Sequence, residues 1–156
     1  YIMTECNWWL MKSEPDIYGI NHLKAERLTL WDGIRNYQAR NFMRSMKNGD
    51  KALFYHSNCK PPCITGIMKI IDTHIIDPTQ FDSTSKYFDP KSKKDNPRWD
   101  CVKVGFLKKF KTTLSLQELK QIYTQEQLQI IRKGNRLSIT PISFDIAEDI
   151  LKRIDS

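Results

Sequence analysis

Two adjacent pairs of polar residues carry side chains that could take part in catalysis. Ser57 follows His56, as a nucleophile beside a base, and Ser13 follows Lys12, as in a local serine–lysine pair. Both pairs fall in or at the end of segments that are typical of strands, where successive side chains point to opposite faces. Neighbours in a strand therefore cannot form the hydrogen bond that joins a nucleophile to its base. We expect no catalytic dyad in either pair, although an enzyme that uses Ser57 or Lys12 with a partner from elsewhere in the fold stays open.

The four cysteines could hold a metal only with further ligands close by. Cys59 and Cys63 have three residues between them, which is half of a zinc-site pattern. Cys6 and Cys101 stand alone, and the three histidines are scattered along the chain. We therefore expect free thiols and no metal, and a reducing, intracellular setting.

Glycines in a cluster would indicate a loop that cradles phosphates. The six glycines of this chain are spread singly and form neither of the common nucleotide-binding patterns. The sequence therefore predicts no nucleotide cofactor.

Aromatic and polar residues at strand ends form a more promising group. Trp31 ends a predicted strand just before a turn, so its ring can stand at the mouth of a sheet, although core packing is the alternative for a single tryptophan. Tyr55 and Ser57 share one face if strand geometry continues through them. Stacking of a nucleobase on such a ring contributes about 1–3 kcal/mol. Arg40 and Arg44, four residues apart on a predicted helix, could hold phosphates nearby.

The elements that must position these residues alternate along the chain. In the segment 37–46, Ala39, Phe42, Met43 and Met46 recur at the spacing of one helix face. Capping patterns and alternating apolar residues indicate the others. We expect strands over 8–12, 28–31, 51–56, 64–75, 99–111 and 136–140, and helices over 20–26, 37–46, 115–123, 124–127 and from 143 to about 154. Strands mixed with helices predict an α+β fold on a mixed or barrel-like sheet.

The segment 77–97 has no clear period and is rich in Asp, Ser, Lys and Pro. A structureless stretch of this length inside a compact domain is usually functional or disordered. Phe81, Tyr87 and Phe88 argue against disorder, because aromatic side chains pack on something.

Composition and charge narrow the class of protein. The 156 residues suit a single domain, which we place over 1–156 with its core at about 7–154. A formal net charge of +7 favours a polyanionic partner such as nucleic acid, although solvated lysine faces are also common. The chain has no apolar run long enough for a membrane span, and residues 1–7 do not resemble a signal peptide.

Several blocks of sequence, in order from about residue 7 to 154, resemble the EVE domain family. They are WLMKSEP (9–15), LWDGIRNYQARN (30–41), FYHSNC (54–59), YFDPKS (87–92), NPRW (96–99) and RLS (136–138). Two positions depart from the pattern: Cys63 stands where relatives often have glycine, and Thr140 replaces a common glutamine. Several blocks in the right order are far more specific than any one motif.

The resemblance implies a PUA-like fold, a small twisted mixed β-barrel flanked by helices. In that superfamily the YTH readers hold one modified base in an aromatic cage, and EVE domains are similarly thought to accept a flipped, methylated or hydroxymethylated cytosine of DNA. Carried over, this implies a base pocket lined by Trp31, Asn36, Tyr55, Ser57, Trp99, Leu137 and Ser138, with Lys12 and Ser13 at its edge and Arg35, Arg40 and Arg98 on the nucleic-acid backbone. Trp31 and Trp99 would stack on the base, while Ser57 and Asn36 would read its polar edge.

Three functions follow from this reading. The first is a non-enzymatic, monomeric, nuclear reader of a modified base in DNA, without a cofactor. The second is an RNA reader, because the same superfold serves RNA and the 2′-hydroxyl changes recognition. The third is an enzyme on a small substrate that uses Ser57 or Lys12, which requires a general base about 3 Å from that group.

Overall fold

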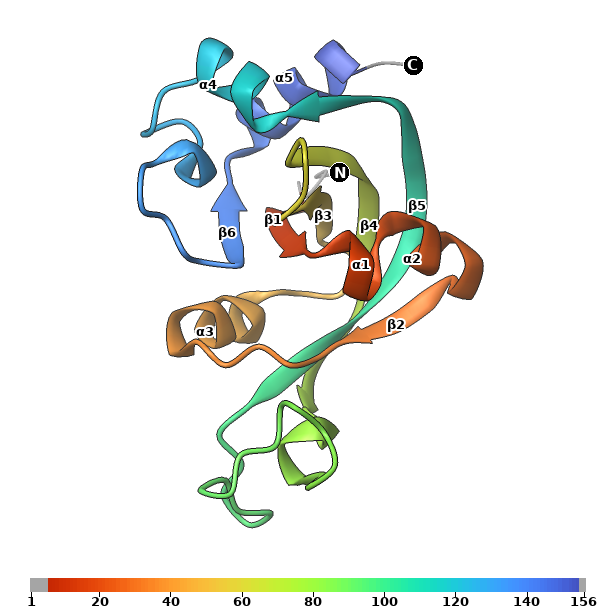
Figure 1. Ribbon diagram of the computed structural model, residues 1–156, viewed down its shortest axis with the longest axis vertical. Helices are drawn as coiled ribbons and strands as arrows, with labels where there is room; N and C mark the ends of the chain where they lie inside the picture. The colour runs from red at the N-terminus through yellow and green to blue at the C-terminus, as the bar shows by residue number, and fades with distance from the viewer. Residues whose placement is uncertain (1–5, 155–156) are drawn as a thin grey trace, which may run out of the picture.

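The computed structural model describes residues 6–154, so the ends of the predicted domain, 1–5 and 155–156, lie outside the described residues. One mixed sheet of six strands carries helices around it, which confirms the predicted α+β class (Figure 1). The strands are β1 (Trp8–Ser13), β2 (Leu28–Trp31), β3 (Lys51–His56), β4 (Cys63–Ile76), β5 (Asp100–Ser115) and β6 (Ile139–Ile142).

The strands lie in the order β2-β5-β4-β3-β1-β6. The pair β1–β3 is parallel, and the other four pairs are antiparallel. The two long strands, β4 and β5, pair with several register shifts, and irregularities of this kind bend strands. Figure 1 shows β5 curving along one side of the molecule, from the segment before it at the bottom to α4 at the top.

The helices are α1 (Pro15–Tyr18), α2 (Ile20–Glu26), α3 (Tyr37–Ser45), α4 (Leu116–Ile122) and α5 (Phe144–Ile154), with 3₁₀ turns η1 (Pro78–Phe81) and η2 (Gln129–Ile131). Local side chains explain two of the starts. The Asn36 side chain accepts a hydrogen bond from the Ala39 amide at 2.9 Å and so caps α3. Ser115 and Glu118 form the predicted capping box at the start of α4. Among the described helices, none has the length and apolar character that a membrane span requires.

Strand β1, which lies between β3 and the edge strand β6, is buried on both faces. Trp8 and Leu10 pack into a core with α4 and α5, while Trp9 and Met11 pack into a second core with α2 and α3. A run of apolar residues such as Trp8–Met11 is the expected signature of a strand covered on both sides. Its carboxyl end, at Lys12 and Ser13, lies beside the end of β3.

Two predicted elements differ most from the structure. The segment 124–127 forms one turn rather than a helix, although the side chains of Thr124 and Gln127 accept hydrogen bonds from each other's amides as in a capping box. Strand β6 begins at Ile139 rather than Arg136 and continues through Pro141. Proline is tolerated there because β6 is an edge strand. The segment 77–97 is built from η1 and turns, in agreement with the argument against disorder.

Candidate functional site

A cavity of about 730 Å³ opens where β1, β2 and β3 end. We call it the Trp31 cavity, because Trp31, the last residue of β2, lines it together with Tyr18 and Tyr87. Its volume lies within the range of roughly 300–1,000 Å³ that is usual for small-ligand pockets. Aromatic rings from three separate segments therefore surround a space that can hold a planar ligand.

Trp31 is both a core residue and a cavity residue. Only 6% of its surface is exposed, and its ring meets Phe54 edge-on with the ring centres 5.4 Å apart. Core packing and a position at the mouth of the sheet were expected as alternatives for this ring, and both hold: it packs on the core and also borders the cavity.

The turn after Trp31 requires glycine. Gly33 has a φ of +78°, and a Cβ atom on it would lie 2.7 Å from the Tyr87 ring. Because Gly33 has no Cβ atom, the ring of Tyr87, 54 residues further along the chain, packs directly on the backbone at the cavity rim. Tyr87 is therefore held as part of the cavity by the shape of the 31–35 turn.

Polar groups in the cavity include hydroxyls with and without partners. The Ser13 hydroxyl donates to the Tyr18 carbonyl at 2.6 Å, so it is already used. The side-chain hydroxyls of Ser57 and Ser138 make no hydrogen bond to residues 6–154 and are free to bind a ligand edge. The Ser138 carbonyl accepts the Lys12 amide at 2.8 Å, which fixes the 132–138 loop against β1.

Three ionisable groups of the cavity, Lys12, Asp32 and Tyr18, have pKa values shifted by their surroundings. Burial lowers the pKa of the Lys12 ammonium. Desolvation, followed by the negative charge of Asp77, raises the pKa of the Asp32 carboxyl. Burial is the largest cause in each case, and a partly buried charge interacts more strongly with a bound ligand than one fully surrounded by water.

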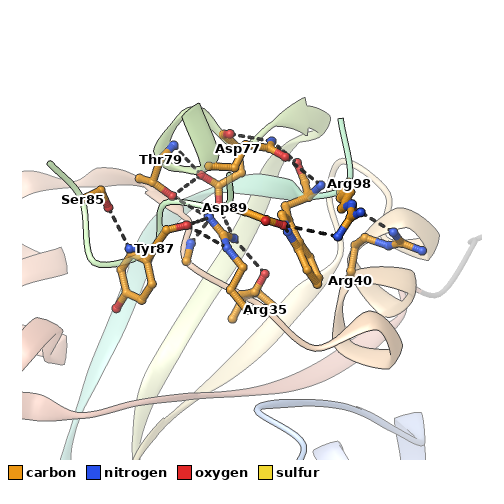
Figure 2. A network of polar contacts seen from close by, with 12 residues as sticks. Arg35, Arg40, Asp77, Thr79, Ser85, Tyr87, Asp89 and Arg98 are labelled. Carbon is orange, nitrogen blue, oxygen red and sulfur yellow. Dashed lines mark hydrogen bonds and ion pairs between the residues drawn. The ribbon is translucent and has the colours of Figure 1, made fainter. Parts of the chain in front are cut away.

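Arg35 fastens the cavity rim to the segment that follows β4. Its guanidinium lies 3.0 Å from the Asp77 carboxylate, which is completely buried, and donates to the Tyr87 carbonyl at 2.7 Å and 3.0 Å (Figure 2). It also donates to Thr79 Oγ1 at 3.0 Å. Asp77 in turn accepts from the Gly33 amide at 2.8 Å. Arg35 was expected to bind a nucleic-acid backbone, but these partners occupy its donors within the protein.

Trp99 lies outside the Trp31 cavity, in a cluster of its own. Its indole Nε1 donates to Asp89 at 2.7 Å, and the Tyr37 ring stacks on it with the centres 4.7 Å apart. Buried Gln80 holds both the carbonyl and the amide of Trp99. The two rings expected to stack on one base therefore do not face one space, because Trp99 closes the loop 77–99 instead.

The other predicted arginines also have partners in the protein. Arg40 donates to the Arg98 carbonyl at 2.8 Å and lies over the Tyr37 ring, and Arg98 is 3.9 Å from Asp89 (Figure 2). Arg44 makes two hydrogen bonds of 3.0 Å with Asp100, and these raise its pKa. The predicted pair Arg40 and Arg44 is thus engaged at the cluster around Trp99 rather than at the cavity.

The predicted site residues divide into two sets. The residues that the structure brings to the Trp31 cavity are Lys12, Ser13, Trp31, Arg35, Ser57 and Ser138. Those that do not line it are Asn36, Tyr55, Trp99, Leu137, Arg40 and Arg98. Asn36 caps α3, and Tyr55 packs in the core beside a neighbouring hollow that also touches Ser57. Leu137 is half-buried on the loop that leads to Ser138.

Several residues that line the cavity were not selected from the sequence, and Tyr18, Asp32 and Tyr87 are the ones whose side chains matter most for a ligand. Asp32 was interpreted only as part of a turn, although its place directly after Trp31 was a usable signal. Tyr87 belongs to a segment without a period, so only its aromatic type indicated that it packs on something. Tyr18 reaches the cavity through α1, and burial with the Glu26 hydrogen bond raises its pKa to about 12.

His56 is not arranged as a base for Ser57. Its Nε2 accepts the Ile20 amide at 3.1 Å, so that lone pair is occupied. Burial and the positive charge of Lys109 lower the pKa of His56. Among residues 6–154 no hydrogen bond links the Ser57 hydroxyl to a base. The four cysteines are free thiols.

The family model described as "EVE domain" matches residues 7–153, in line with the resemblance seen in the motifs. Thymocyte nuclear protein 1 of Homo sapiens is 43% identical over 161 residues, which cover 92% of this chain and 72% of that protein.

Solved structures agree in fold. A protein from Pseudomonas syringae superposes with a TM-score of 0.91 at 44% identity, over 95% of this chain and 99% of that one. Human THYN1, solved in complex with DNA that contains 5-methylcytosine, superposes with a TM-score of 0.89 at 41% identity, over 96% and 98% of the two chains. A YTH domain from Zygosaccharomyces rouxii shares the fold alone, with a TM-score of 0.58 at 14% identity over 100% of this chain and 91% of that one.

Proposed function

This chain belongs to the EVE domain family, and on that basis we propose that it is a non-enzymatic reader that accepts a flipped, modified cytosine of DNA into the Trp31 cavity. The observation that carries the proposal is the cavity itself, bordered by Trp31 where β2 ends. The 5-methylcytosine DNA complex of human THYN1, a relative of the same fold, supports a DNA ligand. Its name and its ligand also support a nuclear location for this chain, which we propose acts as a monomer.

Stacking in the cavity offsets the cost of removing a base from the duplex. Extrusion costs a few kcal/mol, and each base that stacks on an aromatic ring regains about 1–3 kcal/mol. Trp31 and Tyr87 both line the cavity, and the contact of Tyr87 with Gly33 holds its ring in place. A preformed cavity of this kind loses little conformational freedom when it binds.

Asp32 favours a base that carries an amino group. A carboxylate accepts hydrogen bonds and pairs with the exocyclic amine of cytosine, whereas thymine presents a carbonyl oxygen at that position. The free hydroxyls of Ser57 and Ser138 can donate to or accept from the remaining polar edge. The cavity therefore suits cytosine better than thymine or uracil.

A methyl mark adds a small preference. Burial of one methyl carbon contributes about 0.8 kcal/mol, which corresponds to about fourfold in affinity. We expect the reader to prefer methylated DNA by about this factor, and by more where the added carbon contacts an aromatic ring.

Titration of matched duplexes, one with 5-methylcytosine and one with cytosine, tests the proposal. We expect Trp31→Ala to weaken binding of the methylated duplex by at least about fivefold, because a stacking surface of about 1–3 kcal/mol is lost, and to abolish the preference. Tyr37→Phe is the matched control, because this exposed ring lies on Trp99 and outside the cavity. Equal binding of both duplexes that does not change in Trp31→Ala would contradict the proposal. Tighter binding of a matched RNA strand would indicate an RNA reader instead.

Substitution of Asp32 tests the proposed hydrogen bond to the base separately. Asp32→Asn keeps the shape of the side chain but replaces a pure acceptor with a group that both donates and accepts. We expect it to lower the preference for a flipped cytosine over a flipped thymine, measured with duplexes that carry either base opposite a mismatch. An unchanged ratio would show that Asp32 does not contact the base.

A further inference from the structure

A second hollow, of about 550 Å³, adjoins the Trp31 cavity. Lys12 and Ser57 line both spaces, so the two hollows share one boundary at the ends of β1 and β3. The far side of the second hollow is formed by α4, η2 and the residues 132–135. A ligand that enters the first space can therefore extend directly into the second.

The two hollows differ in charge. The residues around the second are free of Asp and Glu and include four cations, Lys12, Lys120, Arg132 and Lys133. We call it the basic groove. The Trp31 cavity, in contrast, is lined by both signs, with the acids Glu14, Glu26 and Asp32. A negatively charged group therefore binds more favourably in the basic groove than in the Trp31 cavity.

The cations of the basic groove are available to a ligand. Lys120, Arg132 and Lys133 are exposed, and the ion pairs found within residues 6–154 involve other arginines. This separates them from Arg35 and Arg44, whose partners lie inside the protein. Cations without internal partners can bind phosphate without first breaking an interaction.

One loop connects the two spaces. Its first half, 132–135, lines the basic groove, and its second half reaches the Trp31 cavity at Arg136 and Ser138. Asn135 holds the bend between them, since its side chain donates to the Gln129 carbonyl at 2.7 Å and accepts the Leu137 amide at 2.8 Å. The relative position of the two hollows is thus set by hydrogen bonds.

We propose that the basic groove binds the backbone phosphates next to the flipped nucleotide, through Lys120, Arg132 and Lys133. The inference rests on the proposed function and assigns to these residues the role that the sequence suggested for Arg35, Arg40 and Arg98. Phosphate contacts carry no base information, so the groove positions the strand while the Trp31 cavity selects the base.

The test compares two triple variants in duplex binding over a series of salt concentrations. Each phosphate contact contributes about 0.9 to the slope of log K against log[salt]. We expect Lys120→Ala/Arg132→Ala/Lys133→Ala to reduce that slope by about 2–3 and to weaken binding at low salt by at least about tenfold. The ratio of methylated to unmethylated affinity should not change.

The matched control removes the same charge elsewhere. Lys108, Lys109 and Lys111 are exposed on β5 and line neither hollow, so Lys108→Ala/Lys109→Ala/Lys111→Ala should change the slope by less than about 1. Equal salt slopes for the two triple variants would overturn the inference, because the lysines and arginine of the groove would then attract DNA only through the net charge of the protein and not through local phosphate contacts. Wild type could also show no preference for methylated DNA while the groove variant still has a smaller salt slope. That result would contradict the proposed recognition of a modified base but would support phosphate binding in the basic groove.

Discussion

Trp31 and Trp99 are almost equally buried, with 6% and 5% of their surfaces exposed, but their surroundings give them different roles. Trp31 packs on Phe54 and borders an open cavity. Trp99 has its indole nitrogen bonded to Asp89, its ring covered by Tyr37, and its backbone held by Gln80. Burial alone therefore does not distinguish a ring that can bind a ligand from a ring that holds a loop. The distinguishing feature is whether an open cavity lies beside the ring.

Arg35 connects the two regions. It lines the Trp31 cavity, and the same guanidinium holds two residues of the loop 77–99, Asp77 at its start and Tyr87 near its middle. The loop 77–99 therefore supplies one ring of the cavity, Tyr87, and keeps its own tryptophan closed within the scaffold. The cavity depends on this loop even though most of the loop lies outside it.

The largest expected effect comes from Trp99. We expect Trp99→Ala to lower the free energy of unfolding by about 3–5 kcal/mol, because a large buried ring leaves a cavity and Asp89 loses its donor. Trp31→Ala should cost less, since part of its ring already borders open space. Chemical denaturation of both variants measures the difference. If Trp31→Ala proves the more destabilising, the two rings have been assigned the wrong roles.

A milder replacement separates the ring of Trp99 from its hydrogen bond. Trp99→Phe keeps an aromatic ring under Tyr37 but removes the Nε1 donor to Asp89. It should lower stability by only about 1–2 kcal/mol and leave the preference for methylated DNA unchanged. A lost preference with retained stability would place Trp99 in the binding site after all.

Arg35 has the next largest expected effect. Arg35→Ala leaves the fully buried Asp77 without its cation, and removal of one partner of a buried pair costs up to about 3–5 kcal/mol. Because 22% of the Arg35 side chain is exposed, we expect about 2–3 kcal/mol, measured by urea denaturation. Arg44→Ala, which breaks the more exposed pair with Asp100, should cost less than about 1 kcal/mol.

Binding data from the same variant address the role of Arg35. A guanidinium that is fully used within the protein contributes nothing to counterion release, so the salt slope of Arg35→Ala should equal that of wild type. A slope lower by about 1 would show that Arg35 contacts phosphate when DNA is bound.

Local patterns were sufficient for most of the elements and for part of the site. The apolar spacing around Ala39 and Met43 predicted α3, and the position of Trp31 before a turn predicted a ring at the end of a strand. Both features depend on residues that are neighbours in the sequence. The alternation of strands and helices also predicted a mixed or barrel-like sheet, but the order of its strands was not predicted, because pairing partners such as β1 and β3 are far apart in the chain.

The rest of the site depends on long-range contacts that no local pattern contains. The charge of Arg35 is visible in the sequence, but its partner Asp77 is 42 residues away. Tyr87 reaches the cavity only because Gly33 leaves room for its ring. In the same way, no local pattern distinguishes Lys120 and Lys133, which make no ion pair with residues 6–154, from Arg35 and Arg44, which do.

The smallest expected effect is a pH dependence at the Trp99 cluster. The hydrogen bond from Trp99, followed by the Lys91 amide, lowers the pKa of Asp89. A carboxyl with a lowered folded-state pKa stabilises the protein above its unfolded value of about 3.9, and this contribution is lost as pH falls through the folded value. Asp89→Asn keeps an acceptor for Trp99 but removes the charge, so it isolates this contribution.

We expect Asp89→Asn to be less stable than wild type near neutral pH, by less than about 1 kcal/mol because the carboxylate is close to solvent. The two stabilities should converge in acid, once the wild-type carboxyl is protonated. Thermal unfolding measured from neutral to strongly acidic pH follows the difference. Parallel curves over the whole range would mean that the charge of Asp89 does not stabilise the Trp99 cluster, and that the closed state of this ring depends on packing alone.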